Sequence, residues 1–310
     1  MPESSQVWDA IIVGGGPAGV SAATVLARSR RRVLIIDDGH QRNLRSHGLH
    51  NFITRDGILP KDFLKIAYEE LTHYPVDIIN QRIVDAIKEP NDNFLLKDKN
   101  GKQYSCKRLL LATGVSDKIP DIPGMKELWG SSVFHCPFCD GYECMVSQIG
   151  MYAKNISGYG MALFLKRLCK KVILFTDGAD YLKPIQKARL EKNKIEIVSE
   201  KISHLVSKDN KLEAVALESG KNLPINSMFT HEGYKVKGHL LEKLGCRCTR
   251  KGVAITNRYQ ESNVKGVYVA GDASFDMHFV IVAAAEGVKA GVAIHNSLLS
   301  EEYKEDLKRR

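Results

Sequence analysis

Two cysteines separated by two residues stand in the segment HCPFCDG, residues 135–141. The spacing of Cys136 and Cys139 allows a small disulfide ring that opens and closes easily, and such a pair passes two electrons at a time. Asp140 follows directly, where its carboxyl group can handle the protons that thiol–disulfide exchange must move. The three residues therefore predict a redox centre whose source of electrons must lie elsewhere in the chain.

A glycine-rich turn near the N-terminus has the surroundings of a dinucleotide-binding site. Residues 7–13, VWDAIIV, form an apolar run typical of a buried parallel strand, and the turn GGGPAG follows over residues 14–19. Residues 20–27 predict a helix, and a second apolar run over residues 32–36 ends at Asp37, which can bind ribose hydroxyls. Strand, turn, helix, strand and acid together make the dinucleotide fingerprint. A glycine-rich turn without a ligand is the alternative.

Each glycine of the fingerprint has an expected task. Gly14 makes the tight turn, Gly16 lets the backbone approach a pyrophosphate, and Gly19 lets helix and strand pack closely. The N-terminus of the helix then faces the phosphates, and Pro17 and Ala18 of the turn are further candidate cofactor contacts.

Two later apolar runs end on small residues that bring the backbone close to a ligand. They are LLLATG over residues 109–114 and VYVAGD over residues 267–272. Each alone is typical of an ordinary β-turn, but with the N-terminal turn they predict that the dinucleotide is FAD. Asp272 can reach a ribityl hydroxyl. The candidate FAD contacts at these two strand ends are Thr113, Gly114, Gly271 and Asp272.

From GGGPAG through ATG and the CxxCD pair to VAGDAS, the chain resembles the low-molecular-weight thioredoxin reductase family of flavoprotein disulfide reductases over nearly its whole length. The resemblance implies an α/β fold of two nested Rossmann-like, three-layer ββα domains, the second inserted in the first. Residues 1–118 and 246–310 would form the FAD-binding domain, and residues 119–245 the inserted domain that carries the CxxC pair. It also suggests a homodimer.

The resemblance assigns roles to individual residues. It implies that the flavin isoalloxazine lies over Cys139, which exchanges electrons with it, while Cys136 attacks the substrate disulfide and Asp140 is the acid. Asn51 falls where the family has an asparagine that contacts the flavin. A thioredoxin-like protein is the natural disulfide substrate.

The inserted domain departs from the family at its NADPH site. After the strand expected at about residues 147–152, the glycines of the turn are replaced by AKN over residues 153–155. A Cβ there obstructs the close approach that a pyrophosphate needs. Where the family has arginines for the 2′-phosphate, Asp177 and Asp180 would repel it, although Lys154 could hold a phosphate as a point charge. NADPH binding is therefore doubtful; a divergent site that binds weakly is the alternative.

A second departure lies near the C-terminus. Phe279 and Val280 occupy positions where the family has an Arg-Gln pair beside the flavin, and His278 precedes them. The backbone amides at the start of the following helix, at Val280 and Ile281, can still stabilise negative charge on a reduced flavin. His278 is a candidate flavin contact or a structural histidine.

Other candidates remain open. In the polar and aromatic loop over residues 45–57, His47 or His50 could serve as a proton relay near the flavin or the thiols, or simply form turns and caps. Cys246 and Cys248 could complete a zinc site with the CxxC pair, but the CxC spacing and the flavin context favour no metal.

Composition limits the class of protein. The chain has 310 residues, 44% of them hydrophobic, with seven cysteines and a net charge of +9. An odd cysteine count argues against a disulfide framework, and no apolar run is long enough to span a membrane. The polar segment 1–6 is no secretory signal, so a cytoplasmic setting is expected. Surface lysines explain the charge by default, and a basic face could also attract an acidic redox protein such as a ferredoxin. No nucleic-acid module is recognisable.

These observations predict an FAD-dependent dithiol–disulfide oxidoreductase that acts on a protein or a small-molecule disulfide. The electron donor is open: NADPH is the family default, and ferredoxin could replace it. Two alternatives remain. The enzyme could run in reverse as a dithiol oxidase that uses oxygen, like the gliotoxin-oxidase-like relatives. The chain could also be a flavin redox sensor that turns over poorly.

Overall fold

The computed structural model of the chain describes residues 7–145, 148–274 and 277–309. Residues 1–6, on which the expectation about a secretory signal depends, and residue 147, at the start of a predicted strand, lie outside this range. The chain divides into two compact units. The first contains residues 1–44, 51–116 and 235–310, and the second contains residues 45–50 and 117–234.

The first unit is built on a seven-stranded sheet, in which six strands follow the order β3, β2, β1, β6, β5, β4 and the seventh, β17, pairs with β6. Its strands are β1 (Val7–Val13), β2 (Val33–Asp37), β3 (Val76–Asn80), β4 (Ile83–Lys88), β5 (Phe94–Asp98), β6 (Gln103–Leu111) and β17 (Val267–Val269). The long β6 pairs in parallel with β1, and its C-terminal part also pairs in parallel with β17. Its N-terminal part pairs with β5 in an antiparallel meander.

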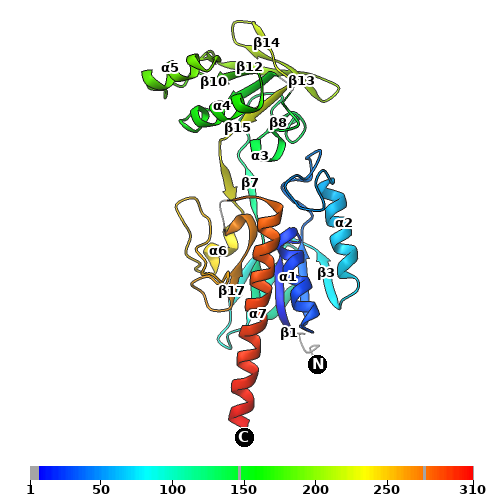
Figure 1. Cartoon of the computed structure of the whole chain (residues 1–310). Coiled ribbons are helices and arrows are strands. Elements are labelled where there is room, and N and C mark those ends of the chain that lie inside the picture. Colours follow the sequence, from blue (N-terminus) through cyan, green and yellow to red (C-terminus); the bar gives the residue numbers. More distant parts are fainter. Residues whose placement is uncertain (1–6, 146–147, 275–276, 310) are drawn as a thin grey trace. The chain divides into compact units, whose positions relative to one another are not determined.

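Helices cover one face of the parallel strands (Figure 1). The helices of this unit are α1 (Pro17–Arg28), α2 (Pro60–Leu71), α6 (His239–Lys243) and α7 (Val280–Arg309), and a 3₁₀ turn, η1, spans Gly271–Ala273. Small residues let α1 and α7 approach closely, because a Cβ on Gly287 would lie 2.1 Å from the carbonyl oxygen of Ala18. The same close approach places the start of α7 beside the start of α1.

The second unit contains a parallel sheet in the order β11, β10, β9, β15, β8 and an antiparallel sheet in the order β12, β13, β14. The parallel strands are β8 (Val133–Phe134), β9 (Gln148–Tyr152), β10 (Lys171–Phe175), β11 (Ile195–Val198) and β15 (Ser227–Thr230). The antiparallel strands are β12 (Ile202–Lys208), β13 (Lys211–Leu217) and β14 (Asn222–Pro224). The helices are α3 (Pro137–Asp140), α4 (Ser157–Leu168) and α5 (Pro184–Lys192).

Alternation along β10 explains the layers of this unit. Val172 and Leu174 pack in one core with residues of α4 and α5, whereas Ile173 and Phe175 pack in another with residues of the antiparallel sheet. Because successive side chains of a strand point to opposite faces, the strand is buried on both sides and reads as one apolar run. The predicted fold class, two Rossmann-like domains with the second inserted in the first, is confirmed.

The unit boundaries differ from those expected from the sequence. The chain passes between the units through β7 (Val115–Asp117) and β16 (Tyr234–Val236), which pair with each other. Residues 235–245, expected in the inserted domain, belong to the first unit because α6 buries Leu240 and Leu241 and Lys243 pairs with Asp85 on β4 at 2.7 Å. Residues 45–50, expected in the FAD domain, belong to the second unit.

Within the part of the chain that the structure describes, no helix combines the length and the apolar character that crossing a membrane requires.

Candidate functional site

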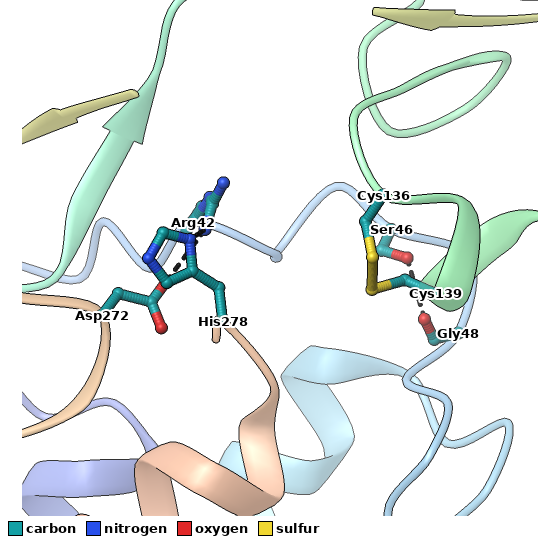
Figure 2. Close-up of a disulfide and its surroundings, with 7 residues drawn as sticks. All are labelled: Arg42, Ser46, Gly48, Cys136, Cys139, Asp272 and His278. Atoms are coloured by element: carbon teal, nitrogen blue, oxygen red, sulfur yellow. Dashed lines mark hydrogen bonds and ion pairs between the residues drawn. A yellow bond between two sulfur atoms is a disulfide. The ribbon is translucent and has the colours of Figure 1, made fainter. Parts of the chain in front are cut away.

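The two cysteines of the CxxC segment form a disulfide with a Cα–Cα distance of 5.3 Å (Figure 2). Pro137 opens the single turn of α3, a position that suits proline because the first helical N–H has no partner within the helix. The carbonyl oxygen of Cys136 accepts hydrogen bonds from the backbone N–H groups of Cys139 and Asp140, each at 3.1 Å. This turn closes the ring and places Asp140 next to it in the chain, as the sequence predicted.

Asp140 is largely buried, and this raises the pKa of its carboxyl group to about 7. Burial disfavours the charged form, the negative charge of Glu143 adds to the effect, and the nearby His50 opposes it. The Nε2 atom of His50 lies 3.4 Å from Oε1 of Glu143. Asp140 can therefore both donate and accept a proton near neutral pH.

The segment Arg45–His50 lies on the second unit and brings His50 to this cluster. The guanidinium of Arg45 donates to the carbonyl oxygen of Lys126 at 3.1 Å, and a ring nitrogen of His47 lies 3.1 Å from the carbonyl oxygen of Ser131. Within the segment, the hydroxyl of Ser46 donates to the carbonyl oxygen of Gly48 at 2.8 Å (Figure 2). Of the two candidate relay histidines, His50 adjoins the acid of the disulfide and His47 contacts backbone.

The glycine turn after β1 has the geometry that its sequence predicted. Gly14 has a φ of 108°, and a Cβ there would lie 2.2 Å from the carbonyl oxygen of Ala112. A Cβ on Gly19 would lie 1.9 Å from the carbonyl oxygen of Gly14. Gly16 differs, because no atom of the described residues, apart from Gly16 and its two neighbours in the chain, lies within 4 Å of the position that its Cβ would take. Two glycines thus allow close packing, while Gly16 leaves open space at the N-terminus of α1, where Pro17 and Ala18 begin the helix.

Asp37 at the end of β2 is hydrogen-bonded to the glycine turn after β1. Its carboxylate accepts hydrogen bonds from the N–H of Gly15 at 2.9 Å and from the side-chain amide of Gln41 at 2.6 Å. The hydroxyl of Tyr68 donates to the carbonyl oxygen of Gly15 at 3.0 Å, and burial, with the charge of Asp37, raises the pKa of that phenol. Asp37 and Tyr68 line a cavity of about 310 Å³ together with residues of α2 and the end of β3, including Lys61. The sequence placed Gly15 in the turn but gave no sign of the contacts from Gln41 and Tyr68.

The two other strand ends also lie in the first unit. Thr113 and Gly114 follow β6, and the Oγ1 atom of Thr113 is shielded from solvent with no hydrogen-bond partner among the described residues. Gly271 has a φ of 77°, and its N–H donates to the carboxylate of Glu286 at 2.8 Å. Glu286 is only 8% exposed and also accepts from the hydroxyl of Ser274 at 2.7 Å, so it fixes the turn after β17.

Asp272 in this turn pairs with Arg42, whose guanidinium lies 3.0 Å from its carboxylate and 2.8 Å from Nδ1 of His278 (Figure 2). His278 is thus joined to the candidate ribityl contact through an arginine that the sequence did not single out. Val280 and Ile281 form the first turn of α7, which carries no acidic residue. Asn51 lies in an exposed turn with a φ of 63°, and its N–H donates to the carboxylate of Asp56 at 3.0 Å.

The corresponding turn of the second unit is occupied by the protein's own side chains. The ammonium of Lys154 lies 2.7 Å from the carboxylate of Asp177, which also accepts from the hydroxyl of Tyr152 at 3.2 Å. Ala153 is fully buried, and a Cβ on Gly158 would lie 2.6 Å from that of Ala153. Lys154, considered from the sequence as a phosphate ligand, instead neutralises the carboxylate that was expected to repel the phosphate.

Cys246 and Cys248 do not form a second disulfide. The thiol of Cys246 contacts the hydroxyl of Ser262 at 3.6 Å, and that of Cys248 contacts the carbonyl oxygen of Cys246 at 3.7 Å. Burial raises the pKa of both thiols. Over residues 7–145, 148–274 and 277–309, no group of three His, Cys, Asp or Glu side chains is placed to hold a metal ion.

The sequence matches a family model, described as pyridine nucleotide-disulphide oxidoreductase, over residues 8–287. The chain belongs to this family. The thioredoxin reductase tcpT of Claviceps purpurea is 32% identical over 309 residues, which cover 96% of each chain. The solved structure of HlmI matches with a TM-score of 0.94 at 29% identity and covers 98% of this chain and 96% of that one. An oxidoreductase from Agrobacterium tumefaciens gives a TM-score of 0.88 at 31% identity, covering 95% and 99%.

Family membership confirms the resemblance found in the motifs and makes the chain a thioredoxin-reductase-like flavoprotein disulfide oxidoreductase. The family implies FAD as the flavin, and three features of the first unit fit it. Gly16 leaves room beside a helix N-terminus, Asp37 lines a cavity at the end of β2, and the Thr113 hydroxyl has no partner in the described protein.

Proposed function

We propose that this oxidoreductase moves electron pairs between its flavin, the Cys136–Cys139 pair and a disulfide or dithiol substrate. FAD, when bound, supplies two-electron chemistry that the side chains lack. One arrangement supports the proposal most strongly. Cys136 and Cys139 form a disulfide across the single turn of α3, and Asp140, whose carboxyl group has a pKa of about 7, follows directly. The same residues serve either direction of transfer.

In the reducing direction, the thiolate of Cys136 attacks a sulfur of the substrate disulfide and forms a mixed disulfide. Protonated Asp140 gives its proton to the substrate thiolate that leaves. The Cys139 sulfur then attacks Cys136, the ring closes, and the second substrate thiolate is released. Cys139 is the residue that we assign to exchange with the flavin, as the family resemblance implies. The cofactor contacts that we propose are Gly14, Gly16, Pro17, Ala18, Gly19, Asp37, Asn51, Thr113, Gly114, Gly271, Asp272, Val280 and Ile281.

Exposed aromatic side chains beside the redox ring support a protein or ring-containing substrate. Phe138 and Tyr142 flank Cys139 and Asp140 in the chain and are 66% and 73% exposed. Phe138 packs on Phe164 with ring centroids 4.8 Å apart, which orders it at the surface. Such rings add contact area at low entropic cost, and we propose a thioredoxin-like protein or a small disulfide as the substrate.

We propose that NADPH is not the electron donor. The ion pair between Lys154 and Asp177 and the buried methyl group of Ala153 occupy the turn that would have to admit a pyrophosphate. The net charge of +9 suits an acidic protein donor, and ferredoxin is such a partner. We also propose a homodimer in the cytoplasm, a setting that keeps the remaining thiols, among them buried Cys106 and Cys169, reduced.

The turn that Ala153 and the Lys154–Asp177 ion pair occupy favours a second candidate function, a dithiol oxidase that uses oxygen. Without a nucleotide donor, a dithiol substrate is itself a source of electrons, and oxygen is an acceptor that needs no protein site of its own. The two functions differ in the direction of flow through the same disulfide.

Anaerobic spectroscopy of the yellow holoprotein tests the proposal. We expect dithiothreitol to bleach the flavin and NADPH or NADH at micromolar levels to leave it oxidised, with reduced ferredoxin as a further donor. Cys139→Ser should keep its FAD and lose dithiol-driven bleaching by at least about 100-fold, because the exchanging sulfur is gone.

Cys169→Ser, a buried cysteine far from the ring in sequence, is the matched control and should bleach as the unaltered protein does. Bleaching of Cys139→Ser at the normal rate would overturn the assignment, and rapid stoichiometric reduction by NADPH would overturn the proposal about the donor. Sustained oxygen uptake with a dithiol identifies the oxidase direction, whereas a single bleach without turnover points to a redox sensor.

A further inference from the structure

A histidine from the segment Arg45–His50 contacts an acid close to the redox disulfide. Nε2 of His50 lies 3.4 Å from Oε1 of Glu143, which lies in the turn after α3, three residues beyond Asp140. The side chain of His50 is 22% exposed and that of Glu143 is 46% exposed, so both reach solvent.

We propose that His50 is a positioning residue for proton transfer at the Cys136–Cys139 disulfide, acting through Glu143 on Asp140. The proposal rests on the function proposed above. In it, the contact of His50 with Glu143 offsets the negative charge that Glu143 places near Asp140. Asp140 then exchanges between its protonated and ionised forms at working pH.

The segment that carries His50 is built to hold it in place. Arg45 and His47 anchor it to backbone carbonyl groups of the second unit, and the side chain of Leu49 is buried. Gly130, with a φ of 81°, lets the chains pass closely, since a Cβ there would lie 3.0 Å from the carbonyl oxygen of Arg45. These contacts of the residues that precede His50 fix the segment on the unit that carries the disulfide.

The charges that act on Asp140 come from few groups. Glu143, in the turn after α3, raises the pKa of Asp140, and His50, from the anchored segment, lowers it; burial is the larger cause of the rise. Cys144 also lies within electrostatic reach of Asp140, but burial raises the pKa of its thiol, which therefore stays neutral near pH 7. Removing His50 leaves the charge of Glu143 uncompensated and makes Asp140 harder to ionise.

The ionisation of Asp140 matters most in the oxidation of a dithiol substrate. A substrate thiol gives its proton to ionised Asp140 while its sulfur attacks Cys136, and the ring opens with Cys139 leaving as a thiolate. The second substrate thiol attacks the sulfur that is bound to Cys136, and its proton passes to Cys136. The substrate disulfide forms, and the reduced pair is left with a Cys136 thiol and a Cys139 thiolate. Two electrons pass from the substrate sulfurs to the pair, and no other reactant is needed.

The test measures the rate of this exchange against pH, anaerobically, in the holoprotein and in His50→Gln, Glu143→Gln and the double variant. The rate in the unaltered protein should rise with pH through about 7, because ionised Asp140 accepts the proton. His50→Gln should move the midpoint upward and Glu143→Gln downward. An upward move of about one unit lowers the rate at pH 7 about fivefold. The double variant should return close to the original midpoint.

The midpoint is also read directly from the ¹³C resonance of the Asp140 carboxyl group, which does not depend on turnover. His204→Gln is the matched control, because it removes an exposed histidine of the second unit, on β12, that takes no part in anchoring the segment Arg45–His50; its midpoint should stay unchanged. An unchanged midpoint in His50→Gln, or an equal shift in His204→Gln, overturns the inference. If the unaltered protein fails to exchange with dithiols at any pH, the proposed function itself is wrong, which is a different result.

Discussion

Asp140 shows how one side chain takes its properties from its neighbours. An ordinary aspartate is ionised well below neutral pH, but burial and the charge of Glu143 raise the pKa of this one to about 7. The sequence predicts its place after the CxxC pair. The sequence does not predict that His50 accompanies it, because ninety residues of chain separate them and their proximity depends on how the segment Arg45–His50 folds back.

Substitutions at two glycines of the turn after β1 should have different effects, one on stability and the other on FAD binding. Gly14→Ala should lower the free energy of unfolding by about 2–5 kcal/mol with or without FAD, because it combines a positive φ with a Cβ 2.2 Å from a carbonyl oxygen. Gly16→Ala should leave the apoprotein within about 1 kcal/mol and weaken FAD binding about tenfold or more, since its Cβ enters the open space beside the helix. Denaturant unfolding and flavin titration measure the two effects.

Gly160→Ala is the control for both changes, because it lies inside α4 with open space around its Cβ position. It should not lower stability and should not change FAD binding. If Gly16→Ala destabilises the apoprotein as strongly as Gly14→Ala, the open space at Gly16 is not where the cofactor approaches.

Several partners of the candidate cofactor site lie far from it in sequence. Glu286 fixes the turn at Gly271, Arg42 pairs with Asp272, and Tyr68 reaches the first glycine turn. Apolar periodicity and glycine spacing predict the turns because both are local patterns. A single polar residue on a distant element carries no such pattern, so these contacts could not be read from the chain.

At the level of secondary-structure elements, two arginines of the first unit form ion pairs with α7. Arg108 of β6 is almost fully buried, and its guanidinium lies 2.8 Å from the carboxylate of Glu301 and donates to the hydroxyl of Ser297 at 3.0 Å. Arg31, just before β2, pairs with Glu302 in the next position of the helix. The charged C-terminal part of α7 therefore docks through two ion pairs.

Glu301→Gln should lower the free energy of unfolding by about 1–2 kcal/mol, because the buried guanidinium of Arg108 keeps a weaker partner. Chemical denaturation measures this. Glu305→Gln, on the exposed part of the same helix, is the control and should change stability by less than about 0.5 kcal/mol. Equal stability of the two variants would show that the ion pair does not secure the helix.

The sequence predicts the elements better than their boundaries. The apolar run over residues 7–13 coincides with β1, whereas the run over residues 32–36 is one residue out of step with β2, Val33–Asp37. The segment over 228–239, which has no regular pattern, contains the end of β15, the whole of β16 and the first residue of α6. Short edge elements such as β16 are stabilised by their pairing partner, here β7, and their own residues carry little periodicity.

At the scale of the whole molecule, one nested architecture carries two nucleotide-type turns with opposite properties. The turn in the first unit leaves space at Gly16, whereas that of the second unit is filled by Ala153 and bridged by Lys154 and Asp177. The sequence predicts this contrast, since glycines are kept in one turn and replaced in the other. We therefore expect one cofactor site and a donor other than NADPH, as proposed above.

Electron exchange between the flavin and the disulfide is tested most directly by an anaerobic reductive titration of the holoprotein, followed at the flavin absorbance. We expect the unaltered protein to take up about four electrons per flavin, two for the flavin and two for the disulfide. The Cys136→Ser/Cys139→Ser variant should take up about two. An uptake of about two electrons by both proteins would contradict electron exchange between the flavin and this pair.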